Sequence, residues 1–215
     1  MNVLYRVDSS IQGTESVTRE ITDEFERAWT AANPNGKVTR RDLLTTPVSP
    51  ATWAESLATH GTVAPTAAEQ AAAALATNLA DEILAADVIV IGAPLYNWGP
   101  SPHVLCWIDM LWTEARFAPR TYPLARKPVV LVTAQGGDDS RGGPRDGWNH
   151  SLPYLTHNLG PHVFGGDITL IDTPLTLAGH SPALAQFTGR ATELRAESHR
   201  RAREVAANLA VDIAA

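Results

Sequence analysis

The chain has 215 residues, of which 44% are hydrophobic and 19% are charged, and its formal net charge is −6. This composition is typical of a folded globular protein and argues against a disordered chain. The 17 basic residues are scattered along the sequence, which argues against a nucleic-acid partner or an anionic membrane partner. A β pattern begins at Val3 and the apolar runs are too short to span a bilayer, so we expect a cytoplasmic protein without a signal peptide.

Strand-like and helix-like segments alternate along the chain. Residues 3–8 predict a first strand, residues 16–32 an amphipathic helix, and residues 38–43 a short edge strand. Residues 66–86 predict a second helix, which opens on a capping-box pattern, and residues 87–92 a buried third strand. Residues 104–112 predict a helix that holds the single cysteine, Cys106, which we read as a small buried hydrophobe. Two more strands, at residues 128–133 and 168–171, precede a last helix at residues 182–213.

The connection between residues 45 and 65 is long and rich in Pro, Thr and Ser. Such a length inside a compact domain favours a functional loop, and we expect it to act as a lid. Trp53 lies within it. We expect Trp53 either to cover the site of a neighbouring subunit or to pack this loop onto the body of the protein.

Five strands that alternate with helices predict one α/β domain spanning residues 1–215, with a doubly wound parallel sheet and helices on both faces. A flavodoxin-like strand order, 2-1-3-4-5, fits the pattern best. In that order the topological switch point lies between the first and third strands. The loops that follow Asp8 and Gly92 are therefore expected to flank one ligand-binding crevice.

The loop after the first strand combines hydroxyl groups with the start of a helix. Ser10 precedes Gly13, and the segment Ser16-Val17-Thr18 opens the helix, where backbone N–H groups lack partners. This arrangement favours a phosphate site. Because neither a Gly-x-Gly-x-x-Gly motif nor a Walker lysine is present, we expect a monophosphate bound without Mg²⁺. The alternative is that Ser16 merely caps the helix.

The loop after the third strand carries two aromatic residues around an amide, Tyr96, Asn97 and Trp98. Pro94 and the Gly99-Pro100 pair are expected to prevent regular structure there. The fourth strand ends at Gly136-Gly137, which would let the backbone approach a ligand closely. These features suit a flat heteroaromatic ring such as a flavin. The alternative is an aromatic surface loop that packs on a partner subunit.

At these positions the chain resembles a known family, the FMN-dependent NADH-azoreductases or NAD(P)H:quinone oxidoreductases. Residues 94–98 are similar to the family's Pro-Met-Tyr-Asn-Phe motif, and residues 134–137 correspond to its Ser-Arg-Gly-Gly turn. The resemblance implies that the FMN phosphate is held by Ser10, Ser16, Val17 and Thr18. It implies that the ring is held largely through backbone groups of Pro94, Leu95, Tyr96, Asn97, Trp98, Ala134, Gln135, Gly136 and Gly137.

The resemblance also implies a mechanism. FMN would receive a hydride from NADH or NADPH and pass it to a quinone or an azo compound in a ping-pong reaction, within a homodimer. The Asn97 backbone N–H would tune N5, and the Gly136-Gly137 turn would stabilise negative charge at N1 and O2. No catalytic side chain is required. The chain departs from the family at Val17, Ala134 and Gln135, which leaves the substrate and the choice of nicotinamide open.

Two other functions fit the same scaffold. One is a specialised biosynthetic or detoxifying flavoenzyme, and the other is a non-catalytic flavodoxin-type electron carrier, against which the mixed surface charge and the long connection argue. No pair of histidines has metal-ligand spacing on one element, so no metal is expected. His150, close after the Gly136-Gly137 turn in sequence together with Trp148, is expected to reach the substrate. No nucleophile elbow for a hydrolase is present.

Overall fold

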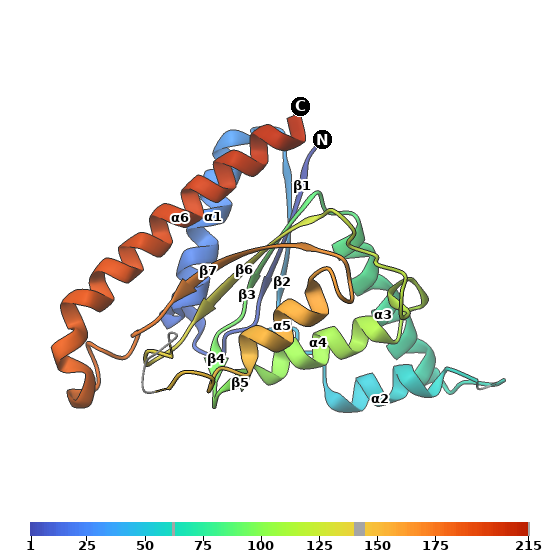
Figure 1. The fold of residues 1–215 in the computed structure, drawn as a ribbon. Helices are drawn as coiled ribbons and strands as arrows, with labels where there is room; N and C mark the ends of the chain where they lie inside the picture. The colour runs from blue at the N-terminus through green and yellow to red at the C-terminus, as the bar shows by residue number, and fades with distance from the viewer. Residues whose placement is uncertain (62, 140–144, 215) are drawn as a thin grey trace.

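The structure is a computed structural model that describes residues 1–61, 63–139 and 145–214 (Figure 1). Five parallel strands form one sheet in the order β2-β1-β3-β6-β7. The strands are β1 (Val3–Asp8), β2 (Lys37–Asp42), β3 (Val88–Gly92), β6 (Pro128–Ala134) and β7 (Asp167–Thr173). Because β4 and β5 lie outside this sheet, the observed order confirms the predicted flavodoxin-like order 2-1-3-4-5.

Helices cover both faces of the sheet (Figure 1). The helices α1 (Val17–Ala32) and α6 (Thr188–Ala214) pack on one face. The helices α3 (Ala67–Leu84), α4 (Pro102–Trp112) and α5 (Ser151–Leu159) pack on the other. Successive residues of β3 point to opposite faces, so Val90 joins the α1–α6 core while Ile91 joins the α3–α4–α5 core. Burial on both faces explains the long apolar runs of the central strands β3 and β6. Within the described residues, no helix has both the length and the hydropathy needed to cross a membrane.

Three predictions about local structure were wrong. The connection after β2 is not a loop throughout, because it holds the helix α2 (Pro50–Ala58), which packs against α3 and α4; its action as a lid stays a prediction. The Ser56 hydroxyl lies 2.7 Å from the Thr113 hydroxyl, in a buried contact that ties α2 to the end of α4. The helix α5 was not predicted, and α6 begins at Thr188 after a 3-10 helix, η3 (Pro182–Phe187), rather than at Pro182. Two further 3-10 helices are η1 (Gly13–Glu15) and η2 (Ala115–Phe117).

The loop after β3 is also more regular than expected, because it folds into a small hairpin. The strands β4 (Leu95–Tyr96) and β5 (Gly99–Pro100) are antiparallel. Asn97 and Trp98 connect them with φ angles of +46° and +67°. Two successive residues with positive φ are typical of a type I′ turn, whose twist matches that of a two-residue hairpin. The turn places Asn97 and Trp98 at the exposed tip of the loop.

An ionic cluster joins the last helix to the first. Glu20 on α1 forms hydrogen bonds with Arg195 and His199 on α6. Burial by itself would raise the pKa of Glu20, but these hydrogen bonds outweigh it and hold the pKa below its ordinary value of 4.5. The Glu20 carboxylate therefore helps to fix α6 against the sheet.

Candidate functional site

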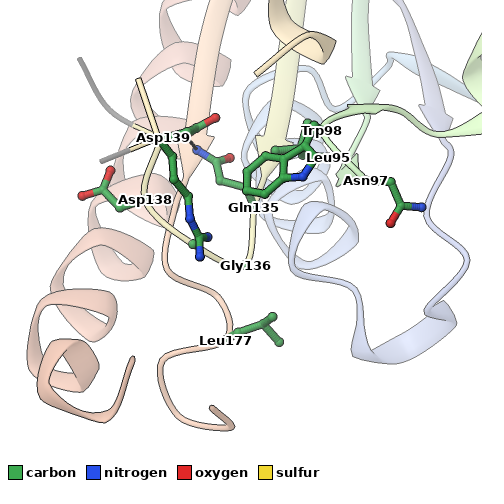
Figure 2. A pocket seen from close by; sticks show the side chains of 10 residues that line it. Leu95, Asn97, Trp98, Gln135, Gly136, Asp138, Asp139 and Leu177 are labelled. Atoms are coloured by element: carbon green, nitrogen blue, oxygen red, sulfur yellow. Dashed lines mark hydrogen bonds between the residues drawn. The ribbon is translucent and has the colours of Figure 1, made fainter. Parts of the chain in front are cut away.

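Two neighbouring cavities lie at the edge where the parallel strands end. The first, which we call the wide cavity, has a volume of about 250 Å³, and the second, the narrow cavity, has about 150 Å³. Both are lined by Leu95, Gly136 and Leu177, so they adjoin, and we call the two together the crevice. Figure 2 shows the wide cavity, which is lined in addition by Asn97, Trp98, Gln135, Gly137, Asp138, Asp139 and Arg145. The narrow cavity is lined in addition by Gln12, Ser16, Val17, Thr18, Pro94, Tyr96, Ala134 and Thr176.

The narrow cavity contains the start of α1. The Ser16 hydroxyl caps this helix by accepting a hydrogen bond from Arg19 N at 3.2 Å, and it lies 3.0 Å from the Thr18 hydroxyl. The N–H groups of Val17 and Thr18 have no acceptor among the described residues. No basic side chain of the described residues lines this cavity. Unpaired N–H groups at the positive end of a helix dipole are suited to an anion such as a phosphate.

Tyr96 connects the loop after β3 to the loop after β1. Its hydroxyl lies 3.0 Å from the Ser10 hydroxyl and accepts a hydrogen bond from Ile11 N at 3.2 Å. The Ser10 hydroxyl in turn accepts one from Gln12 N at 3.2 Å. Ser10 lines neither cavity, so the structure places it behind the crevice, where it shapes the loop. A direct contact between Ser10 and a ligand stays a prediction.

The glycine turn after β6, Gly136-Gly137, has backbone N–H groups that are available as hydrogen-bond donors in the crevice. The carbonyl groups of Gly136 and Gly137 accept hydrogen bonds from Leu177 N and Leu175 N, at 3.2 and 2.9 Å. The N–H groups of Gly136 and Gly137, in contrast, have no acceptor among the described residues. The Leu177 side chain lies directly on Gly136, at the point where the two cavities meet (Figure 2).

The Gln135 side chain is turned away from the crevice and is only 4% exposed. Its amide donates hydrogen bonds to Asp139 at 2.8 Å and to Asp172 at 3.0 Å. Asp172 also accepts a hydrogen bond from Thr133 at 2.6 Å. Burial, followed by the charge of Asp139, raises the pKa of Asp172. The side chain of Gln135 thus anchors the glycine turn to β7 and contributes to the cavity wall without pointing into the cavity.

Aromatic residues surround the mouth of the wide cavity. Trp98 lies edge-on to Trp148, with ring centroids 5.1 Å apart and an angle of 81° between the planes. The guanidinium of Arg145 lies 5.3 Å from the centroid of Trp98. His150 N donates a hydrogen bond to the Trp98 carbonyl at 2.8 Å. His150 therefore contacts the hairpin through its backbone, although neither His150 nor Trp148 lines the described cavities.

The structure brings together nearly all the residues predicted for the site. Apart from Ser10, every residue predicted for cofactor binding lines one of the two cavities. Trp53 does not, because α2 carries it elsewhere in the same chain. The wall formed by Thr176 and Leu177 was not predicted from the sequence. The position of this wall was nevertheless implied, because β7 ends at the same edge as its parallel neighbours.

Known proteins resemble this chain along nearly all its length. A family profile described as a flavodoxin-like fold matches residues 1–162. The FMN-dependent NADH:quinone oxidoreductase of Frankia casuarinae is 37% identical over 204 residues, which are 93% of this chain and 96% of that relative. The protein of the same name from Streptomyces coelicolor is 31% identical and covers 99% of each chain. The structure of an azoreductase from Bacillus anthracis has the same fold, with a TM-score of 0.78 and 22% identity over 97% of this chain and 100% of that one. The chain belongs to the family of FMN-dependent NADH:quinone oxidoreductases with a flavodoxin-like fold.

Proposed function

We propose that this chain binds FMN in the crevice and uses NADH to reduce a quinone or an azo compound. The observation that carries the proposal is that one crevice joins two sets of unpaired N–H groups, at the start of α1 and at the glycine turn. Each cavity alone is smaller than typical cofactor sites, whereas together they reach the usual range of about 300–1,000 Å³. The names of the relatives support the identity of the cofactor, the donor and the acceptor.

The residues of the narrow cavity would hold the phosphate. The Ser16 and Thr18 hydroxyls and the N–H groups of Val17 and Thr18 provide donors without a basic side chain. Tyr96 closes this end and fixes the loop of Ser10 before the ligand arrives. Binding through the backbone explains why a valine at position 17 is compatible with phosphate recognition.

The residues of the wide cavity would hold the ring. When bound, FMN supplies two-electron hydride chemistry that protein side chains lack. The N–H groups of Gly136 and Gly137 have no protein acceptor among the described residues, so they can stabilise negative charge on the ring. The backbone N–H of Asn97, at the tip of the hairpin, is the proposed donor for N5. Trp98 forms an aromatic wall at the mouth and excludes water there.

The donor and the acceptor would use the same mouth of the wide cavity in turn. Trp98, which lies edge-on to Trp148 and lines the wide cavity, would stack on either flat molecule. Alternate occupation of one mouth gives ping-pong kinetics. In a plot of reciprocal rate against reciprocal NADH concentration, a series of quinone concentrations would give parallel lines, whereas intersecting lines would exclude this order.

We include a homodimer in this proposal because the mouth of the crevice exposes large apolar side chains. Trp148 is 50% exposed and Leu177 49% exposed, beside Trp98. A second copy of the chain would cover them, and Trp53 of α2 would reach the neighbouring mouth. Light scattering at micromolar and nanomolar concentration, with the activity measured in parallel, tests this point. A monomer that is fully active at nanomolar concentration would exclude it.

The first experiment is the absorption spectrum of the purified protein after loading with FMN and desalting. Retained flavin bands that NADH bleaches without oxygen, and that a quinone restores, would support the proposal. Steady consumption of NADH with excess quinone distinguishes an enzyme from an electron carrier. A protein that retains no FMN, or retains FMN that NADH does not bleach, would refute it.

A further inference from the structure

We propose that Arg145 supplies the positive charge that stabilises reduced FMN in the wide cavity, because its guanidinium lies against Gly137 and beside Trp98. This inference rests on the proposed function and deepens it. Arg145 lies outside the motifs that were identified in the sequence.

The guanidinium of Arg145 lies against Gly137. Arg145 Nη1 occupies the position that a Cβ atom on Gly137 would need, and Arg145 Cζ is 3.5 Å from that position. The charge therefore lies at the glycine turn, which lines the wide cavity and whose N–H groups have no acceptor among the described residues. Arg145 lines the wide cavity together with Asp138, Asp139 and Trp98, which are labelled in Figure 2.

Trp98 holds the guanidinium in this position. The Arg145 guanidinium lies 5.3 Å from the centroid of the Trp98 ring, within the range of a cation–π contact. Trp98 is itself steadied by the edge of Trp148 at 5.1 Å. Across residues 1–61, 63–139 and 145–214, no carboxylate forms an ion pair with Arg145. Arg145 itself lines the wide cavity.

Side chains of both charges line the wide cavity. Among the described residues that line it, Arg145 is the single cation, beside the carboxylates of Asp138 and Asp139. Asp139 accepts a hydrogen bond from the Gln135 amide, and Asp138 is exposed to solvent. Gln135 stands where the resembling family has an arginine, and its side chain points to Asp172. Arg145 thus provides the positive charge that position 135 does not.

The chemistry explains why a cation is useful at this place. Bound FMN would accept a hydride, which is two electrons and one proton, from NADH at N5, and NAD⁺ would leave. The reduced ring would carry a negative charge shared between N1 and O2, which a fixed positive charge would stabilise. The quinone would then take the hydride from N5 and a proton from water, which would restore the uncharged ring.

The test compares FMN affinity in the oxidised and reduced states for Arg145→Gln, Arg145→Lys and a control, Arg201→Gln. Arg201 is exposed on α6 and forms no ion pair with a described residue, so its substitution makes the same change in net charge. Fluorescence titration gives the dissociation constant of oxidised FMN, and equilibration with a reference dye gives the midpoint potential. The pKa of N1 in the reduced flavin is followed by absorbance.

We expect Arg145→Gln to bind oxidised FMN within about twofold of the native protein, and reduced FMN about tenfold more weakly, at the low end of the cost of losing one hydrogen bond to a charged group. A tenfold change corresponds to a midpoint potential lower by about 30 mV for a two-electron couple. The pKa of N1 should rise in the same variant. Arg145→Lys should keep most of the native potential, and Arg201→Gln all of it.

The outcomes separate the inference from the proposed function. If the native protein binds no FMN, both fail. If Arg145→Gln binds FMN with the native potential, the inference fails while the function stands. If Arg145→Gln weakens both redox states equally, or alters only the KM for carboxylated or sulfonated quinones, Arg145 has a structural or substrate-binding role and the inference is again wrong.

Discussion

Two serines of this chain allow the phosphate site to be tested separately from helix capping. Ser16 caps α1 by accepting from Arg19 N at 3.2 Å, and Ser49 caps α2 by accepting from Thr52 N at 3.0 Å. Each also lies about equally close to a threonine hydroxyl, at 3.0 and 2.9 Å. Only Ser16 lines the crevice. Ser16→Ala and Ser49→Ala therefore remove the same local interaction at the site and away from it.

The expected magnitudes follow from burial. Loss of a serine cap costs about 1 kcal/mol of unfolding free energy. At Ser16, which is 3% exposed, the Thr18 hydroxyl also loses its partner, so we expect about 2 kcal/mol there and about 1 kcal/mol for Ser49→Ala. A hydrogen bond to a charged group contributes about 1.5–3 kcal/mol, so Ser16→Ala should weaken FMN binding by about 10- to 100-fold. Ser49→Ala should leave it unchanged.

Three measurements separate these effects. Urea unfolding of the FMN-free protein gives the stability of each variant, and fluorescence titration gives its affinity for FMN and for riboflavin, which lacks the phosphate. Ser16→Gly keeps most of the capping energy, since glycine costs only a few tenths of a kcal/mol as a cap, but it lacks the hydroxyl. It should therefore lose FMN affinity as Ser16→Ala does, while costing less stability than Ser16→Ala, because only the loss of the Thr18 contact remains. Equal weakening of FMN and riboflavin by Ser16→Ala would refute the phosphate assignment.

Three further predictions concern the glycine turn, the buried carboxyl and the helix contact. In Gly136→Ala the new Cβ would lie 2.5 Å from the Leu177 side chain, so FMN affinity should fall at least tenfold. The double variant with Leu177→Ala should recover part of the lost affinity. If the double variant recovers none, the clash is not the cause. Because the pKa of Asp172 is raised, its stabilising effect is present at low pH and is lost as the pH rises through that pKa. Asp172→Asn should therefore become more stable relative to the native protein as the pH rises, and parallel urea midpoints between pH 4 and 9 would contradict this. The pKa of Glu20 is lowered, so its stabilisation is present above 4.5 and is lost as the pH falls through the lowered pKa; Glu20→Gln should cost about 1 kcal/mol at pH 7, and the two thermal unfolding curves should converge in acid.

The sheet and its order could be predicted from the sequence because its central strands are buried on both faces. Burial on both faces produces continuous apolar runs, such as residues 88–91, which stand out beside helical patterns. The helices α2 and α5 were harder to predict. Each is short and partly exposed, and each contains a proline, so its apolar periodicity extends over too few residues.

The crevice could be located from the sequence because topology fixes which loops meet. The loops after β1, β3 and β6 follow parallel strands and so share one edge of the sheet. The direction of individual side chains could not be predicted in this way. The Gln135 side chain points inward because its amide donates hydrogen bonds to Asp139 and to Asp172 on β7. The contact with Asp172 joins segments that are distant in the chain, so it leaves no local pattern in the sequence. Arg145 reaches the turn through a stacking contact, which is likewise invisible in sequence.

The turn of the β4–β5 hairpin has a consequence for how this protein can change by mutation. Asn97 and Trp98 adopt left-handed backbone conformations there. Asparagine is favoured at such a turn position, whereas glycine in place of Trp98 would avoid a cost of about 1–2 kcal/mol. Under selection for stability alone, glycine would be favoured over tryptophan at position 98, and one substitution is enough to introduce it. A tryptophan at this position therefore indicates selection for its indole ring. Libraries that vary acceptor preference should keep this residue and compensate its cost in the helices far from the crevice, where stabilising changes leave the mouth untouched.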